Sequence, residues 1–338
     1  MASVKKLPSG KWNAVAYYKD PATGKVSRPS FTAPTKAEAV RMAAEWEASK
    51  ERMKSPRDMT VADCIDRYIK SKEGAISPST LREYRRMQRT RYSSIASLSI
   101  SKLGEEDLQR YVSSLSNEVS PKSVANAYGL LISSVSMFSD RAYRVTLPAP
   151  RPAERHIPSD DDIRRLIEEA SPDLRLSICL AAFGTLRLGE VAALTHGDVD
   201  KTACTVRIHA DMVKGPDGWV VKENPKTTSS NRTVPLPAKV TDMIGDGEPA
   251  ERIIKVLPCT IERAFIKLRD RLGLKCRFHD LRHYAASIMH ALGIPDVYIM
   301  ERGGWKSDTV LKSIYRNSLS DQSAKFQDKA NNHFDSLL

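Results

Sequence analysis

Residues 279–315 combine four side-chain types that can act together on a phosphodiester. His279 can accept a proton, Arg282 carries a fixed positive charge, the Trp305 indole can donate a hydrogen bond, and Tyr315 offers a phenolic nucleophile. Phosphodiester transfer spreads negative charge over the non-bridging oxygens, and a metal-free site needs fixed guanidinium groups to stabilise that charge. Arg187, in the run FGTLRLGEVAAL, supplies a second guanidinium. The residue types therefore favour a site that cuts a phosphodiester.

A helix is needed to position the His–Arg part of this set. Apolar residues recur at the i, i+3, i+4, i+7 spacing of a core-facing helix: Leu281, Tyr284, Ala285, Ile288, Met289 and Leu292. This spacing predicts that His279, Arg282 and His283 lie off the buried side. A polar helix face is ordinarily only solvated, so this segment alone leaves both interpretations open.

Two other segments add to the candidate site. Arg187 lies in a Gly-bounded, otherwise apolar run, so we expect Arg187 and Glu190 to form a buried pair beside the site instead of a surface ion pair. Lys226, in NPKTTSSNRTVPLP, falls in a turn between two predicted strands. We interpret His283 as a semi-buried supporting residue that forms local hydrogen bonds, and not as a direct participant.

The ordered set resembles the tyrosine recombinases of phages and mobile elements. That family carries Arg, Lys, His-x-x-Arg, His or Trp, and Tyr, and the corresponding residues here are Arg187, Lys226, His279, Arg282, Trp305 and Tyr315. The match covers roughly the last half of the chain, and Trp305 stands where most members carry His. The resemblance implies that Tyr315 forms a 3′-phosphotyrosyl bond, that His279 is the base and that Lys226 is the acid. It implies no cofactor and no metal.

Element patterns predict an α+β, multidomain chain. Residues 1–56 predict a small three-stranded sheet with one helix, residues 57–148 an all-helical domain, residues 149–158 a Pro-rich linker, and residues 159–338 a mainly helical domain with a small antiparallel sheet. The resemblance implies that these are an arm-type DNA-binding domain, a core-site DNA-binding domain and the catalytic domain.

Several element boundaries follow from turn and cap residues. The predicted strands are Ser3–Lys6, Trp12–Tyr18, Val26–Phe31, Thr205–Val213, Trp219–Glu223 and Arg232–Pro235. Thr35 with Glu38, Thr60 with Asp63, and Ser159 with Asp162 predict helix starts, and Pro121 begins a helix that we expect to continue to about Tyr143.

A net charge of +12 favours a polyanionic partner. The predicted phosphate contacts, all basic, are Lys5, Lys6, Lys11, Lys19, Lys25 and Arg28 in the first domain, and Arg82, Arg85, Arg86 and Arg89 in the second. The simpler interpretations are a solubilising appendage for residues 1–56 and a solvated helix face for the arginines.

The five cysteines are scattered without metal-binding spacing, so we expect free thiols in a cytoplasmic, nucleoid-associated protein. No secretory signal and no apolar run long enough to cross a membrane is present in the sequence. His279 and His283 have the spacing of the zinc motif H-E-x-x-H, but Asp280 follows the first His, and we expect no metal site.

The sequence therefore predicts a site-specific recombinase that integrates and excises a prophage or mobile element. The resemblance implies double-stranded DNA with core-type and arm-type sites, a homo-tetramer on DNA, an excisionase and a host DNA-bending protein as partners. We expect the tail after Tyr315 to dock on a neighbouring protomer. The alternatives are a type IB topoisomerase-like strand swivel and a non-catalytic DNA-binding regulator.

Overall fold

The computed structural model describes residues 3–19, 26–52, 59–150, 156–223, 231–305 and 307. The chain divides into two compact units, Met1–Pro152 and Ala153–Leu338. Helices dominate and the sheets are small and antiparallel, as expected for the α+β class. Within the first unit, one hydrophobic cluster lies before residue 52 and a separate one after residue 58. The finer division into three domains and a linker stays a prediction.

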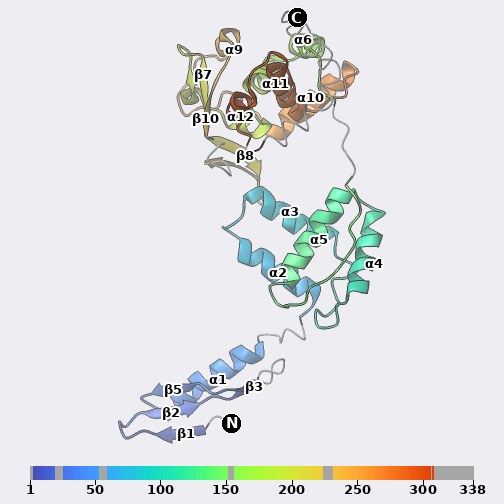
Figure 1. Cartoon of the computed structure of the whole chain (residues 1–338). Helices are drawn as coiled ribbons and strands as arrows, with labels where there is room; N and C mark the ends of the chain where they lie inside the picture. The colour runs from blue at the N-terminus through green and yellow to red at the C-terminus, as the bar shows by residue number, and fades with distance from the viewer. Residues whose placement is uncertain are drawn as a thin grey trace, which may run out of the picture. The chain divides into compact units, whose positions relative to one another are not determined.

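The amino-terminal sheet is three-stranded, with β2 in the centre. Its strands are β1 (Ser3–Lys6), β2 (Trp12–Val15) and β5 (Ser30–Ala33), and helix α1 (Lys36–Arg52) packs against it through small residues (Figure 1). A separate pair is formed by β3 (Tyr18–Lys19) and β4 (Val26–Ser27).

The predicted strand Val26–Phe31 was therefore wrong, because it is two strands in two different sheets. Pro29 separates them, since proline has no backbone N–H for the sheet ladder. Its carbonyl instead accepts a hydrogen bond from the Ala16 N–H, at 3.0 Å. The predicted strand Trp12–Tyr18 was also wrong as a single element, because it divides into β2 and β3.

Three of the four helices between residues 59 and 150 begin at a Ser or Thr side-chain cap, and α4 (Glu105–Ser116) begins at Gly104. The other three are α2 (Val61–Lys72), α3 (Pro78–Thr90) and α5 (Pro121–Val135). The Asp63 N–H donates to the Thr60 hydroxyl, and the Asp63 carboxylate accepts from the Thr60 N–H. This reciprocal capping box confirms the predicted start of α2.

The expected continuation of α5 to Tyr143 was wrong, because the helix ends at Val135. The following chain lies against α4 instead: the Arg144 N–H donates to Glu105 Oε1 at 2.7 Å, and the Thr146 N–H donates to Gln109 Oε1 at 2.9 Å. Tyr143 packs against the helical core. These long-range contacts satisfy backbone donors of the segment that follows the helix.

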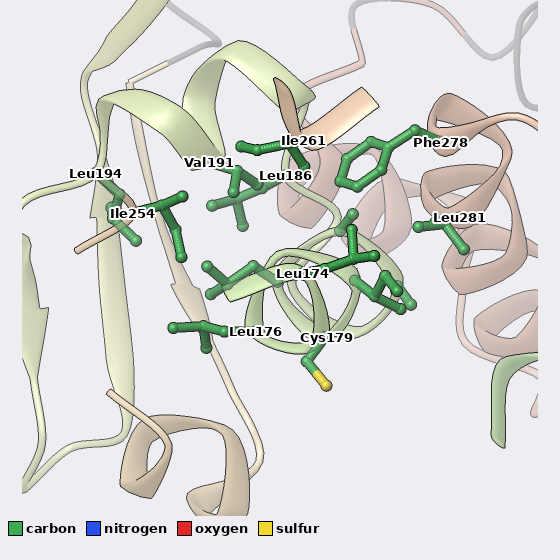
Figure 2. Close-up of a cluster of buried hydrophobic side chains, with 14 of the residues drawn as sticks. Leu174, Leu176, Cys179, Leu186, Val191, Leu194, Ile254, Ile261, Phe278 and Leu281 are labelled. Atoms are coloured by element: carbon green, nitrogen blue, oxygen red, sulfur yellow. The ribbon is translucent and has the colours of Figure 1, made fainter. Parts of the chain in front are cut away.

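The second unit is organised around the buried helix α7 (Pro172–Gly184). Around it lie α6 (Asp160–Glu169), α8 (Leu188–Ala193), α9 (Ala238–Asp242), α10 (Pro258–Arg271) and α11 (Phe278–Ala291), and α12 (Asp296–Gly303) packs on α11. Figure 2 shows Leu186 and Val191 in the same cluster as Phe278 and Leu281. The segments that carry Arg187 and Arg282 therefore share one core.

Two small sheets complete this unit. β10 (Arg232–Pro235), β7 (Thr205–Ile208) and β6 (Val199–Asp200) form one, and β8 (Ala210–Lys214) and β9 (Trp219–Glu223) form a hairpin (Figure 1). The predicted strand Thr205–Val213 was wrong as a single element. It divides at His209 into β7 and β8, which enter different sheets, and His209 Nε2 lies 2.8 Å from Asp198 Oδ1.

Among the described residues, no helix has the length and apolar character needed to cross a membrane.

Candidate active site

Arg187 and Glu190 form the expected pair at the start of α8. The Arg187 N–H donates to Glu190 Oε2 at 2.8 Å, and Arg187 Nη1 donates to Oε1 at 2.6 Å. Arg187 is the residue that precedes α8, and the Glu190 carboxylate caps the start of the helix by accepting the Arg187 N–H. The Glu190 side chain is 1% exposed, whereas that of Arg187 is 35% exposed. One carboxylate therefore fixes a guanidinium that still reaches solvent.

Arg232 is a site residue that the sequence did not indicate. It lies on β10 with a side chain 5% exposed, and its Nη2 donates to Glu190 Oε2 at 2.9 Å. Its Nε donates to the Arg302 carbonyl at 3.0 Å. An arginine inside the strand RTVP, at a position that alternation makes inward-facing, was the available signal.

The arginines keep Glu190 ionised despite its burial. Burial alone would raise the pKa of this carboxyl, but the hydrogen bonds and charge of Arg232, together with the charge of Arg187, outweigh it and leave the pKa below its ordinary value. An ionised carboxylate then fixes two guanidinium groups at once.

Arg282 is a buried neighbour of Arg187 and Glu190. It is 1% exposed, and its Nη1 and Nη2 donate to the Thr185 and Gly303 carbonyls. Its Nε has no hydrogen-bond partner within the described part of the chain. Burial, and then the charge of Arg187, lowers the pKa of Arg282. Since an arginine side chain nevertheless stays protonated, a buried positive charge lies close to the partly exposed one.

The Trp305 ring covers Arg282. The guanidinium carbon lies 4.2 Å from the ring centroid, a cation–π arrangement. A Cβ at position 303 would lie 1.9 Å from Trp305 Cζ3, so only glycine leaves room for the ring. Gly304, at φ 61°, ends α12 in the left-handed conformation and turns the chain back.

The predicted helix 280–292 is present, but the expected orientation of its polar residues was wrong for Arg282 and His283. Arg282 is 1% and His283 is 5% exposed, and the expected core residue Leu292 is 73% exposed. Both α7 and α12 pack against α11, so a second side of the helix is covered. Periodicity identifies one buried stripe and cannot show that another helix covers the opposite face.

His279 lies at the exposed start of α11, as expected. The protein around it removes part of the hydration of its ring and lowers the pKa, and the charge of Arg282 lowers it further, against an opposing effect of Asp280. The His279 and His283 rings meet edge to face at 4.9 Å between centroids. A neutral imidazole beside two arginines can accept a proton at neutral pH.

The structure brings Arg187, His279, Arg282 and Trp305 together with the supporting residue Glu190. Lys226, Tyr315 and the tail that follows lie outside the described residues, so their parts in the site stay predictions. No group of His, Cys, Asp or Glu in the described ranges is arranged to hold a metal ion.

The amino-terminal sheet carries several of the predicted DNA contacts at its surface. Lys5, Lys6, Lys11 and Arg28 are exposed. The Lys6 ammonium lies 6.0 Å from the Trp12 ring centroid, and the Arg28 guanidinium lies 5.5 Å from that of Tyr17. Lys19 lies on β3, and Lys25 is outside the described residues.

The four arginines of α3 differ in their pairing. Arg85 Nη2 lies 2.6 Å from Glu73 Oε1, and Arg86 Nε donates to Glu83 at 2.8 Å. Arg82 and Arg89 are exposed and have no ion pair with the described residues. These two, seven positions apart, are the freest to contact phosphate.

Comparison with known proteins finds similarity to phage integrases and tyrosine recombinases. The model of the Phage integrase family matches residues 254–322. A Tyrosine recombinase XerC-like protein of Caldanaerobacter subterraneus subsp. tengcongensis is 25% identical over 210 residues, 52% of this chain and 54% of that protein. The ICEBs1 integrase of Bacillus subtilis is 24% identical over 97% of this chain and 98% of its own length. The chain thus spans about half of the first relative and nearly all of the second.

Two solved structures share the fold. The Tn1549 transposon integrase in complex with a circular intermediate DNA superimposes with a TM-score of 0.67 at 14% identity, covering 80% of this chain and 99% of that one. A lambda integrase tetramer bound to a Holliday junction gives a TM-score of 0.58 at 18% identity, covering 90% of this chain and 96% of that one. At these identities the likeness concerns the fold.

Proposed function

We propose that this chain, which belongs to the tyrosine recombinase (phage integrase) family, is a site-specific recombinase that integrates and excises a prophage or mobile element. The observation that carries the proposal is the arginine cluster itself. Arg187, held by buried Glu190, and Arg282, held by backbone carbonyls, lie beside an exposed histidine of lowered pKa. Two fixed cations next to a base suit stabilisation of a phosphoryl-transfer transition state.

The cleavage step uses residues of this chain alone. The Tyr315 phenolic oxygen attacks the phosphorus and gives its proton to His279, and a Tyr–phosphate bond forms at the 3′ side. The bond from phosphorus to the 5′ oxygen breaks, and Lys226 supplies the proton that makes the 5′-hydroxyl. In the reverse direction, the 5′-hydroxyl of a partner strand attacks and releases Tyr315, so no external energy source enters.

The remaining residues stabilise charge. Arg187, whose side chain is 35% exposed, can donate hydrogen bonds to a non-bridging oxygen, and the buried Arg282 adds a second positive charge nearby. The Trp305 indole can only donate, which fits an oxyanion contact and excludes proton transfer at that position.

Double-stranded DNA is the proposed partner, with core-type sites contacted by α3 and arm-type sites contacted by the amino-terminal sheet. The exposed Arg82 and Arg89 support the first contact, and the exposed Lys5 and Lys6 support the second. By analogy with the lambda integrase tetramer on a Holliday junction, four protomers exchange strands in two rounds. An excisionase and a host DNA-bending protein would set direction, and the protein would act at the bacterial nucleoid.

The proposal is tested with a DNA duplex that carries a candidate attachment site and a 5′-bridging phosphorothiolate, in the absence of metal. The cleaved thiolate rejoins poorly, so the covalent complex accumulates. We expect a protein–DNA adduct with the wild type and none with Tyr315→Phe. If no adduct forms on any such duplex, the chain is a DNA-binding regulator and the proposal fails.

A second substrate separates a recombinase from a type IB topoisomerase. Two differently labelled duplexes are incubated together, and joint molecules are separated by size. A recombinase joins strands of different duplexes, whereas relaxation of supercoiled DNA without any joining would identify a strand swivel.

A further inference from the structure

Strand β8 approaches the start of α8 more closely than any side chain at position 189 would allow. A Cβ on Gly189 would lie 1.9 Å from Asp211 Oδ1 and 2.7 Å from the Met212 carbonyl oxygen. The carboxyl group of Asp211 therefore occupies the place of a side chain on α8, one residue before Glu190 and two after Arg187. This contact joins the β8–β9 hairpin to the arginine cluster.

Asp211 lies between positive charges of two elements. Lys222 is its direct cross-strand partner on β9, and Arg187 lies at the start of α8. The charged groups that act on Asp211 are Glu190 and Arg187 from α8 and Lys222 from β9. Its carboxylate accepts no hydrogen bond from the described residues, so charge and packing are its interactions there.

Stability does not explain a carboxylate at this position. Burial, followed by the charge of Glu190, raises the pKa of Asp211 in spite of Arg187 and Lys222. A raised folded-state pKa means that the stabilising contribution is complete below the unfolded-state pKa and is lost as pH rises through the folded-state pKa. Burial of Asp211 therefore costs stability once the group is ionised, and a neutral isostere would avoid that cost.

We infer that Asp211 is a positioning residue that seats the β8–β9 hairpin on α8 and thereby sets the end of β9 relative to Arg187. β9 ends at Glu223, and Lys226, the proposed general acid, follows three residues later in the sequence. This inference rests on the proposed function, because it assigns Asp211 a part in delivering Lys226.

The experiment compares two substrates that differ in one atom. An ordinary 5′-oxygen leaves with a proton from the general acid, whereas the sulfur of a 5′-bridging phosphorothiolate leaves as a thiolate without one. Asp211→Asn should slow adduct formation on a nicked, ordinary phosphodiester suicide substrate by about 10- to 100-fold, the usual effect of a slightly misplaced catalytic group. On the phosphorothiolate its rate should return close to that of the wild type.

Matched variants define the outcome. Asp217→Asn makes the same change at the exposed tip of the same hairpin and should leave both rates unchanged. Lys226→Ala should show the same rescue as Asp211→Asn, and Arg187→Ala should be slow on both substrates. The melting temperature of Asp211→Asn should equal or exceed that of the wild type, which excludes an effect through unfolding.

The results distinguish a failure of this inference from a failure of the proposed recombinase function. If Lys226→Ala is rescued by sulfur but Asp211→Asn is not, or if Asp211→Asn cleaves the ordinary substrate at the wild-type rate, Asp211 does not position the hairpin. A lowered melting temperature that accounts for the lost rate would also overturn the inference. Absence of any Tyr315-dependent adduct would instead refute the proposed recombinase.

Discussion

Arg232 and Glu190 form a buried bidentate ion pair that links β10 to the start of α8. Arg232 Nη1 donates to Glu190 Oε1 at 3.1 Å and Nη2 to Oε2 at 2.9 Å, with both side chains at most 5% exposed. The pair orders the carboxylate that also holds Arg187. Arg232 therefore acts on the site without facing the substrate.

Arg232→Met should destabilise the protein. The change leaves Glu190 buried with only Arg187 to balance its charge, and breaking a buried pair on one side costs about 3–5 kcal/mol. Urea denaturation followed by far-UV circular dichroism measures this difference. The control is Arg263→Met at an exposed position of α10, expected within about 0.5 kcal/mol of wild type. Equal midpoints for both variants would mean that the pair has no net stabilising role.

Cleavage should remain active below the ordinary titration range of histidine. The pKa of His279 lies under its ordinary value of 6.5, so the imidazole stays neutral and able to accept a proton as pH falls to that value. Single-turnover adduct formation, measured across pH, should decline only at lower pH. The acid limb should disappear in the residual activity of His279→Gln. A midpoint above the ordinary histidine value would contradict this assignment.

Two substitutions at Trp305 separate hydrogen-bond donation from packing. Trp305→Phe keeps an aromatic face for Arg282 but removes the indole N–H, and should slow cleavage by about 10²-fold or more, the usual effect of losing one oxyanion donor. Trp305→His restores a donor and should recover part of the rate. Adduct formation at saturating DNA gives both values. Wild-type rates for Trp305→Phe would show that Trp305 only packs.

Asp280→Ala should remove a cap that starts the helix of His279. The Asp280 carboxylate accepts the Arg277 N–H at 2.8 Å, and losing such a cap costs about 0.5–2 kcal/mol. Burial opposes the ionised form, but the Arg277 contacts outweigh it and lower the pKa below 3.8. The stabilisation is therefore present above pH 3.8 and is lost as pH falls through the lower, folded-state pKa. Denaturation of variant and wild type should differ at neutral pH and converge in strong acid.

The exposed arginines of α3 should contribute to DNA affinity through phosphate. Arg82→Ala and Arg89→Ala should each reduce the slope of log K against log salt by about 0.9, the value for one lost contact. Arg85→Ala, whose guanidinium is already paired with Glu73, serves as the control and should change the slope less. Fluorescence anisotropy over a salt series measures these slopes. Slopes equal to that of the wild type in all three variants would mean that α3 does not contact DNA.

Local chemistry in the sequence determined most helix starts. The capping boxes at Thr60–Asp63 and Ser159–Asp162 work across three residues, so the sequence contains both partners and the structure confirms both. The Arg187–Glu190 pair was predictable for the same reason, since its two members are three residues apart. The resemblance to tyrosine recombinases likewise needed no coordinates, because it rests on the order in the sequence of Arg187, Lys226, His279, Arg282, Trp305 and Tyr315.

Only the tertiary structure decided which polar groups are buried and which distant residues meet. Arg282 is buried because the Gly303 carbonyl at the end of α12 and the Trp305 ring lie against it. Arg232 forms a hydrogen bond with Glu190, which is 42 residues away in the sequence. After α5 ends at Val135, Glu105 and Gln109 of α4 accept the N–H groups of Arg144 and Thr146. Periodicity and propensity describe one element at a time. Contacts between elements far apart in sequence set the geometry of the site, and no local pattern encodes them.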